Sequence, residues 1–133
     1  LMTVADMDKE EAAEIAKCFE DLGYVVIATS GTAKFLKEKG VTVKVATKVS
    51  EGHPNILDDI KSGRISMVIN TTNHGRDAER DGFKIRRSTV EHAIACLTSL
   101  DTARELQRVM SAMRRRRIVN VVALQDLSLS WED

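Results

Sequence analysis

Side chains that can bind phosphate recur in four places in this sequence, each soon after an apolar segment. They comprise two lysines, hydroxyl and amide side chains and one glycine: Lys9, Thr29, Ser30, Gly31, Thr32, Lys48, Asn70, Thr71 and Thr72. Hydroxyl groups donate hydrogen bonds to phosphate oxygens, and lysine supplies a compact positive charge. A glycine such as Gly31 lets the backbone approach a ligand closely. If the fold brings these residues together, they form a phosphate-binding site.

The same residue types also form turns and helix N-caps, so no single member of the set identifies a ligand. Thr29 or Ser99 taken alone is typical of an N-cap. The set as a whole favours phosphate, because a helix behind such a turn also offers free N–H groups and the positive end of its dipole.

The sequence contains no arrangement that indicates catalysis or a metal. His53, His74 and His92 are scattered, none lies beside a nucleophile, and they lack the spacing of metal ligands. We therefore expect no catalytic residue and no metal site. Residues 114–117 are consecutive arginines, which favours a helix end where cations offset the dipole. A contact of these arginines with another domain or with nucleic acid is the alternative.

Five apolar segments typical of strands would position the phosphate-binding set. They span residues 1–5, 24–28, 41–46, 66–70 and 94–98, and residues 118–124 form one further strand candidate. Helical patterns lie at residues 8–22, 32–39, 56–61 and 88–93, and after Ser99, where Ala103, Leu106, Met110 and Met113 form one stripe. Asp8 and Glu11 resemble a capping box, and residues 71–82 are expected to form a polar loop.

Strands that alternate with helices predict an α/β fold with a doubly wound, mainly parallel five-stranded sheet flanked by helices. The strand segments are almost continuously apolar, as in a sheet that helices cover on both faces. Ligands of such sheets bind outside the carboxyl ends of the strands. Because every member of the phosphate-binding set follows a strand, we expect the whole set at that edge.

Length and composition fit a single globular domain. The 133 residues suffice for one core, and hydrophobic and charged residues make up 43% and 30% of them. Lys and Arg number 20, as do Asp and Glu, so net charge favours neither nucleic acid nor a membrane. No apolar run approaches the roughly 20 residues of a membrane span, and we expect a cytoplasmic protein. Cys18 and Cys96 lie in apolar segments and are expected to be buried, reduced thiols.

Five short motifs occur in the order and at the spacings of one known family. They are Asp-Lys at 8–9, Ala-Thr-Ser-Gly-Thr at 28–32, Thr-Lys-Val-Ser-Glu-Gly-His-Pro at 47–54, Ile-Asn-Thr-Thr at 69–72 and Ile-Arg-Arg-Ser at 85–88. Through them the chain resembles the C-terminal allosteric domain of the carbamoyl phosphate synthetase large chain, a methylglyoxal synthase-like, Rossmann-type domain. The resemblance implies that residues 1–133 are one such domain, a fragment of a larger chain.

The resemblance implies a regulatory site for a nucleoside monophosphate. In the family UMP inhibits and, in some members, IMP activates, and both bind at this edge of the sheet. Lys9, Thr29, Thr32 and Lys48 would hold the phosphate, while Asn70 and the two threonines after it would border the base and ribose. The domain itself would be non-catalytic and would carry no cofactor.

The resemblance implies further partners through the parent enzyme. That enzyme is an ATP-dependent ligase that makes carbamoyl phosphate from bicarbonate, ATP and glutamine nitrogen for pyrimidine or arginine biosynthesis. The expected partners are the synthetase domains of the same chain and a glutaminase small chain, and the large chains can self-associate through this domain. ATP and Mg or Mn ions would bind in the other domains.

A free-standing phosphate lyase of the methylglyoxal synthase type, similar in fold and phosphate turn, is the alternative. That enzyme has a histidine near the end of its first strand and a Gly-Gly-Asp after its third, whose aspartate is the catalytic base. Here Ala5 and residues 50–54 take these places, so the base is missing. The ornithine site of some synthetases is not expected either, because Leu97 replaces its carboxylate before Thr98.

Overall fold

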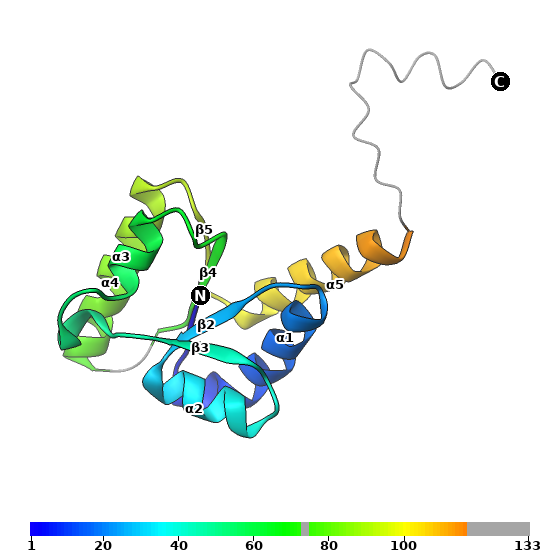
Figure 1. Cartoon of the computed structure of the whole chain (residues 1–133), viewed down its shortest axis with the longest axis horizontal. Helices are drawn as coiled ribbons and strands as arrows, with labels where there is room; N and C mark the ends of the chain where they lie inside the picture. The colour runs from blue at the N-terminus through cyan, green and yellow to red at the C-terminus, as the bar shows by residue number, and fades with distance from the viewer. Residues whose placement is uncertain (73–74, 117–133) are drawn as a thin grey trace, which may run out of the picture.

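A parallel sheet with helices on both faces forms the domain (Figure 1). In the computed structural model, which describes residues 1–72 and 75–116, the strands are β1 (Met2–Thr3), β2 (Val26–Thr29), β3 (Val43–Ala46), β4 (Met67–Asn70) and β5 (Ala95–Leu97). The helices are α1 (Lys9–Asp21), α2 (Ser30–Glu38), α3 (Ile56–Lys61), α4 (Arg76–Glu91) and α5 (Leu100–Arg116). Two short 3-10 turns, η1 (Asp6–Asp8) and η2 (Val49–Glu51), follow β1 and β3.

The strand order confirms the predicted α/β fold. The five strands pair in the order β3-β2-β1-β4-β5, and every pair is parallel. The chain therefore moves outward from β1 to β3 and then returns to the other side of β1 to add β4 and β5. The order reverses between β1 and β4, and in open parallel sheets a ligand crevice forms at such a reversal, outside the carboxyl ends of the strands.

Each face of the sheet packs on its own apolar cluster. Helices α1, α2 and α5 contribute Phe19, Leu36 and Ala103 to one cluster, and α3 and α4 contribute Ile56 and Ile85 to the other. Figure 1 shows these two helix groups on opposite sides of the strands. Successive residues of β4 enter different clusters, because side chains alternate across a strand. Helices on both faces explain why the strands are apolar throughout.

The prediction of a loop at residues 71–82 is wrong, because α4 begins at Arg76. Its buried residues are Gly82, Ile85, Ser88 and Thr89, so its core-facing side carries a single large aliphatic residue. An apolar stripe at helical spacing is the main sequence signal of an amphipathic helix, and this helix lacks one. The helical segment predicted at residues 88–93 is the last part of α4.

Other boundaries differ in smaller ways. Helix α3 has the predicted bounds, whereas α2 begins at Ser30, before the predicted residue 32. The predicted capping box at Asp8 is wrong: Asp8 ends η1, its side chain makes no capping hydrogen bond, and Glu11 instead pairs with Arg104 at 3.0 Å. Both cysteines are free, but they are half-buried rather than buried. The strand candidate at residues 118–124 lies outside the described residues.

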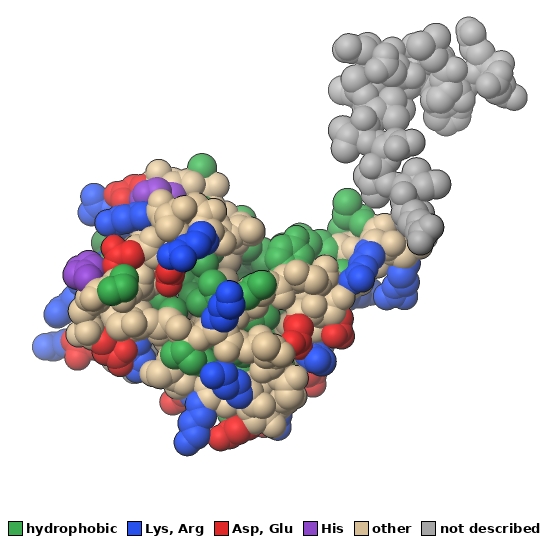
Figure 2. Space-filling model, in the orientation of Figure 1, with side chains coloured by type: hydrophobic (Ala, Val, Ile, Leu, Met, Phe, Trp, Pro, Cys, Tyr) green, Lys and Arg blue, Asp and Glu red, His purple; other side chains and the backbone are tan. Residues whose placement is uncertain are grey.

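None of the helices in the described part of the chain is long and apolar enough to cross a membrane. Lysine, arginine and acidic side chains are interspersed over the face in Figure 2. The interspersed charges on this face agree with the balanced net charge of the sequence.

Candidate functional site

The carboxyl edge of the sheet gathers the residues that the sequence predicts for phosphate binding. Lys9 begins α1, Thr29 ends β2 and is followed by the first residues of α2, and Lys48 precedes η2. Asn70 ends β4, and two threonines follow it. All five strands are parallel, so the turns that follow them lie at the same edge.

The turn between β2 and α2 presents an open helix N-terminus. Thr29 occupies the N-cap position with extended backbone (φ −68°, ψ 158°), yet its side chain makes no capping hydrogen bond. The first turn of α2 contains no acidic residue. Ser30 and Gly31 are exposed, whereas Thr29 and Thr32 are 9% and 4% exposed. The first N–H groups of α2 and the positive end of its dipole are therefore available to an anion.

One lysine from a neighbouring turn lies beside this helix N-terminus. The Lys9 ammonium nitrogen lies 4.0 Å from the point where a Cβ atom on Gly31 would lie, and 2.6 Å from Oδ1 of Asp6. The hydrogen bond and charge of Lys9, and then the charge of Lys48, lower the pKa of Asp6. The edge therefore carries the Lys9 ammonium paired with one exposed carboxylate, a pairing that an anionic ligand can replace.

Asn70 and Thr71 join β1 to β4 at the point where the strand order reverses. The Asn70 amide nitrogen donates to Oγ1 of Thr3 at 2.6 Å, and the backbone N–H of Ala5 donates to Oγ1 of Thr71 at 2.8 Å. Both side chains are buried, Asn70 with 4% exposed, whereas Thr72 is exposed. Asn70 and Thr71 thus stabilise the strand ends, and Thr72 is the more accessible of the polar residues after β4.

A family model described as "MGS-like domain" matches residues 11–98, more than half of the chain. The chain belongs to the MGS-like domain family. MGS-like domains occur in regulatory domains of carbamoyl phosphate synthetase and in methylglyoxal synthase. The match includes every predicted site residue except Lys9, and it ends before α5.

The MGS-like domain places one further cation at this edge that the sequence reasoning did not assign to the site. Nη1 of Arg86, from α4, donates to Oδ1 of Asn70 at 2.8 Å. The motif Ile-Arg-Arg-Ser at residues 85–88, which contains this arginine, supported the family resemblance, but the arginine was given no role in the site. The expected loop at residues 71–82 hid the signal, because it broke α4 and left Arg86 without a helix to place it.

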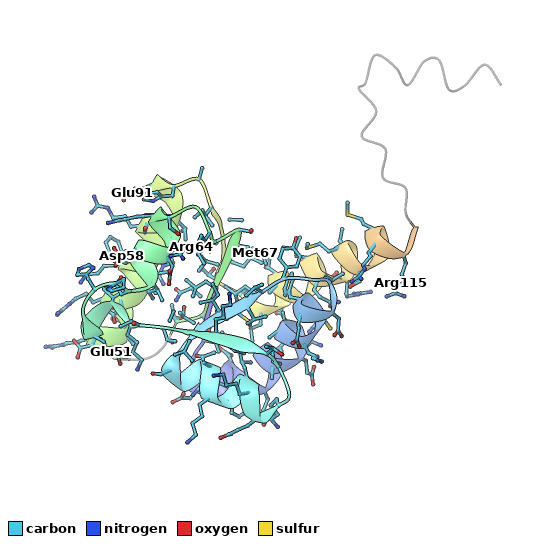
Figure 3. The ribbon with its side chains drawn as sticks, viewed as in Figure 1. Glu51, Asp58, Arg64, Met67, Glu91 and Arg115 are labelled. Atoms are coloured by element: carbon cyan, nitrogen blue, oxygen red, sulfur yellow. The ribbon has the colours of Figure 1, made fainter. Side chains whose placement is uncertain are left out.

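The two described histidines make contacts with residues close to them in the sequence. His53 has a 77% exposed side chain, and its Nδ1 lies 2.9 Å from Oδ2 of Asp58, an ion-pair geometry that lowers the pKa of Asp58. Figure 3 shows Asp58 on α3, on the same side of the molecule as Glu51 in η2. His92 follows α4, and its Nδ1 lies 2.8 Å from the Ser88 carbonyl oxygen. His74 lies outside the described residues.

No group of three or more histidine, cysteine or acidic residues in the described ranges of this MGS-like domain could hold a metal ion. Arg114, the first of the four consecutive arginines, donates to the carbonyl oxygen of Asp21 at the end of α1. That contact places a cation where the α1 dipole is negative, whereas the sequence predicts that the arginines offset the dipole of their own helix. Arg117, the last of the four, lies outside the described residues.

Proposed function

We propose that this MGS-like domain is the regulatory domain of a carbamoyl phosphate synthetase large chain and binds a nucleoside monophosphate such as UMP or IMP. The observation that carries the proposal is the open N-terminus of α2, with the Lys9 ammonium beside Gly31. Backbone N–H groups, hydroxyls and two lysines are the groups that bind phosphate in proteins. No other described helix start combines these features.

In this proposal the phosphate sits over the first turn of α2. It accepts hydrogen bonds from the free N–H groups and from the hydroxyls of Thr29, Ser30 and Thr32. Lys9 and Lys48 neutralise its charge, and Lys9 exchanges its pairing with Asp6 for the phosphate. The nucleoside extends toward the β1–β4 reversal, where Asn70, Thr71 and Thr72 border it.

Regulation follows if the nucleotide binds two conformations of the parent enzyme with different affinity. The synthetase domains of the same chain would respond to that shift, and they would hold the ATP and metal ions of the reaction. A glutaminase small chain would supply the nitrogen, and the large chains would self-associate through this domain. Pyrimidine or arginine biosynthesis in the cytoplasm is the corresponding pathway and location.

A methylglyoxal synthase-like lyase is the alternative, and within residues 1–72 and 75–116 the carboxyl edge offers it no suitable base. Ala5 is buried at the end of β1, where that enzyme has a histidine. Lys9 lowers the pKa of Asp6, which makes this carboxylate a weak base. His53 is exposed and bound to Asp58. Binding without catalysis is therefore the function that the geometry supports better.

Calorimetric titration with UMP, IMP and inorganic phosphate tests the proposal. We expect saturable binding of a nucleotide and a loss of about tenfold or more in Lys48→Ala, because that variant lacks one of the two cations on the phosphate. Lys37→Ala is the matched control, since Lys37 is an exposed lysine in the last turn of α2, at the end opposite the phosphate turn.

Three results would decide against the regulatory proposal. A folded domain that binds none of the three ligands lacks the site altogether. Equal losses in Lys48→Ala and Lys37→Ala would indicate general charge attraction instead of a site. Release of phosphate from dihydroxyacetone phosphate would instead establish the lyase.

A further inference from the structure

The Arg86 guanidinium lies within the candidate site and has an unusual environment for an arginine. It is half-buried on α4, and its Nη1 donates to Oδ1 of Asn70 at 2.8 Å. Within residues 1–72 and 75–116 no carboxylate forms an ion pair with it. The next residue, Arg87, is exposed and pairs with Glu91 at 2.9 Å, as a surface arginine of a helix commonly does.

Gly82 provides the space that Arg86 occupies. A Cβ atom on Gly82 would lie 2.9 Å from Nη1 of Arg86 and 3.5 Å from Oδ1 of Asn70. Gly82 is inside a helix and is not among the glycines with positive φ, so its backbone conformation does not require glycine. Glycine is less favourable than alanine in a helix interior. The remaining reason for glycine at this position is room for the contact between Arg86 and Asn70.

The contact determines which way the Asn70 amide faces. A guanidinium group has only donors, so the Asn70 atom that faces Arg86 must be the carbonyl oxygen. The amide nitrogen then points to Thr3, to which it donates one of its two hydrogens at 2.6 Å. The second amide hydrogen has no partner among the described residues. Arg86 thereby fixes Asn70 as a donor at the reversal between β1 and β4.

We propose that Arg86 is a positioning residue that makes Asn70 a hydrogen-bond donor to an oxygen of the nucleoside part of the ligand. The inference rests on the proposed nucleotide site and extends it. The phosphate contacts come from the α2 turn and the two lysines, on the other side of β1 from Asn70. Arg86 therefore governs the preference for a nucleotide over inorganic phosphate and leaves phosphate affinity itself unchanged.

Titrations of UMP and inorganic phosphate into four proteins test the inference. Arg86→Met removes the donor but keeps a long side chain that favours helix, and we expect about tenfold weaker UMP binding, the value of one hydrogen bond. Phosphate affinity should stay within about twofold. Arg86→Lys, which keeps a charged donor, should restore part of the UMP affinity. Arg87→Met is the matched control and should match the wild-type protein for both ligands.

A second variant disturbs the contact between Arg86 and Asn70 without removing any charge. Gly82→Ala places its methyl group against the Arg86 guanidinium and should weaken UMP binding severalfold while phosphate binding is retained. Because alanine favours helix, this variant should unfold at the same or a higher temperature than the wild-type protein. If the measured unfolding temperature is not lowered, a binding loss in Gly82→Ala cannot be attributed to a damaged fold.

The outcomes separate this inference from the proposed function. If the wild-type protein binds neither UMP nor phosphate, the proposed function fails and the assignment of Arg86 falls with it. If the wild-type protein binds both ligands and Arg86→Met weakens both equally, Arg86 contacts the phosphate and the positioning role is overturned. Unchanged UMP binding in Arg86→Met and Gly82→Ala would likewise overturn it.

Discussion

The N-termini of α2 and α3 differ in how they satisfy their backbone. Helix α3 begins with a complete cap: Oδ1 of Asn55 accepts from the N–H of Leu57 at 2.9 Å, and Oδ2 of Asp58 accepts from the N–H of Asn55 at 2.8 Å. Its first turn also carries two acidic residues. The N-cap residue of α2, Thr29, makes no capping side-chain hydrogen bond, and the first turn of α2 carries no acidic residue.

The difference shows that the residue type at an N-cap does not decide whether a helix N-terminus can bind an anion. Asn55 and Thr29 are both good N-cap residues by type. In α3 the side chains of Asn55 and Asp58 already accept from N–H groups at the helix start, and acidic side chains already complement the dipole. An external anion therefore has little to add there. In α2 no side chain caps the first N–H groups and no acidic residue complements the dipole, and the Lys9 ammonium lies beside this helix start. An anion is what would complete α2, just as Asp58 completes α3.

The largest effect should come from giving α2 an acidic residue in its first turn, as α3 has. Ser30→Asp adds a carboxylate to the exposed first residue of α2, where it complements the dipole but repels a phosphate. We expect nucleotide and phosphate affinity to fall by about 100-fold or more, equivalent to roughly 2.7 kcal/mol. The free energy of unfolding should stay the same or rise by about 0.3–1 kcal/mol. Calorimetry and urea unfolding measure the two quantities.

Thr102→Asp is the matched control for Ser30→Asp. Thr102 is an exposed residue in the first turn of α5, which follows β5 at the far end of the sheet from β2. Its added charge should leave binding nearly unchanged. A similar loss in both variants would mean that net charge, rather than the α2 turn, controls affinity.

A pair of alanine substitutions tests the comparison through stability. Asn55→Ala removes a side chain that is 2% exposed, caps α3 and also donates to the Gly52 carbonyl at 2.7 Å. We expect it to lower the free energy of unfolding by about 1–2 kcal/mol. Thr29→Ala removes no capping bond and should lower it by less, about 0.5 kcal/mol. If urea unfolding gave equal costs, the two helix starts would not differ as described.

The sequence predicted the fold well because the strands carry a strong signal. Five apolar segments, separated by helical patterns, require a covered parallel sheet, and that sheet brings the ends of β1 to β4 together. The list of residues predicted to bind phosphate followed from the same rule, since ligands bind at the carboxyl edge. Their common position at the carboxyl edge of the sheet therefore needed no knowledge of side-chain contacts.

The features that could not be predicted from the sequence, helix α4 and the state of the helix caps, depend on contacts between distant segments. Helix α4 buries a glycine, a serine and a threonine, so no apolar stripe marks it, and its contribution of Arg86 to the site stayed hidden. The state of each helix cap was hidden for a related reason. Asp8 with Glu11 has the spacing of a capping box, but η1 gives Asp8 helical backbone (φ −96°, ψ −5°), and the cap does not form.

The smallest expected effect is a dependence of α3 on acid that α2 should lack. The hydrogen bond with His53, and then the backbone N–H of Asn55, lower the pKa of Asp58 from its ordinary value of 3.8. A carboxyl group whose pKa is lowered by folding stabilises the fold at pH values above its ordinary pKa of 3.8. This stabilisation is lost as the pH falls through the pKa of the folded state. The difference in stability between wild type and Asp58→Asn should therefore be full near neutral pH and shrink below about pH 4.

Urea unfolding of both proteins over this pH range measures the difference, and amide hydrogen exchange locates it. Protection of the Asn55 amide, corrected for the intrinsic exchange rate at each pH, should fall on acidification in the wild type, because the Asp58 carboxylate that accepts from this N–H becomes protonated. The first amides of α2 should show no such step, since their turn holds no carboxylate to protonate. A matching acid step at α2 would mean that a carboxylate, with Asp6 the nearest candidate, already occupies the place that we assign to the phosphate.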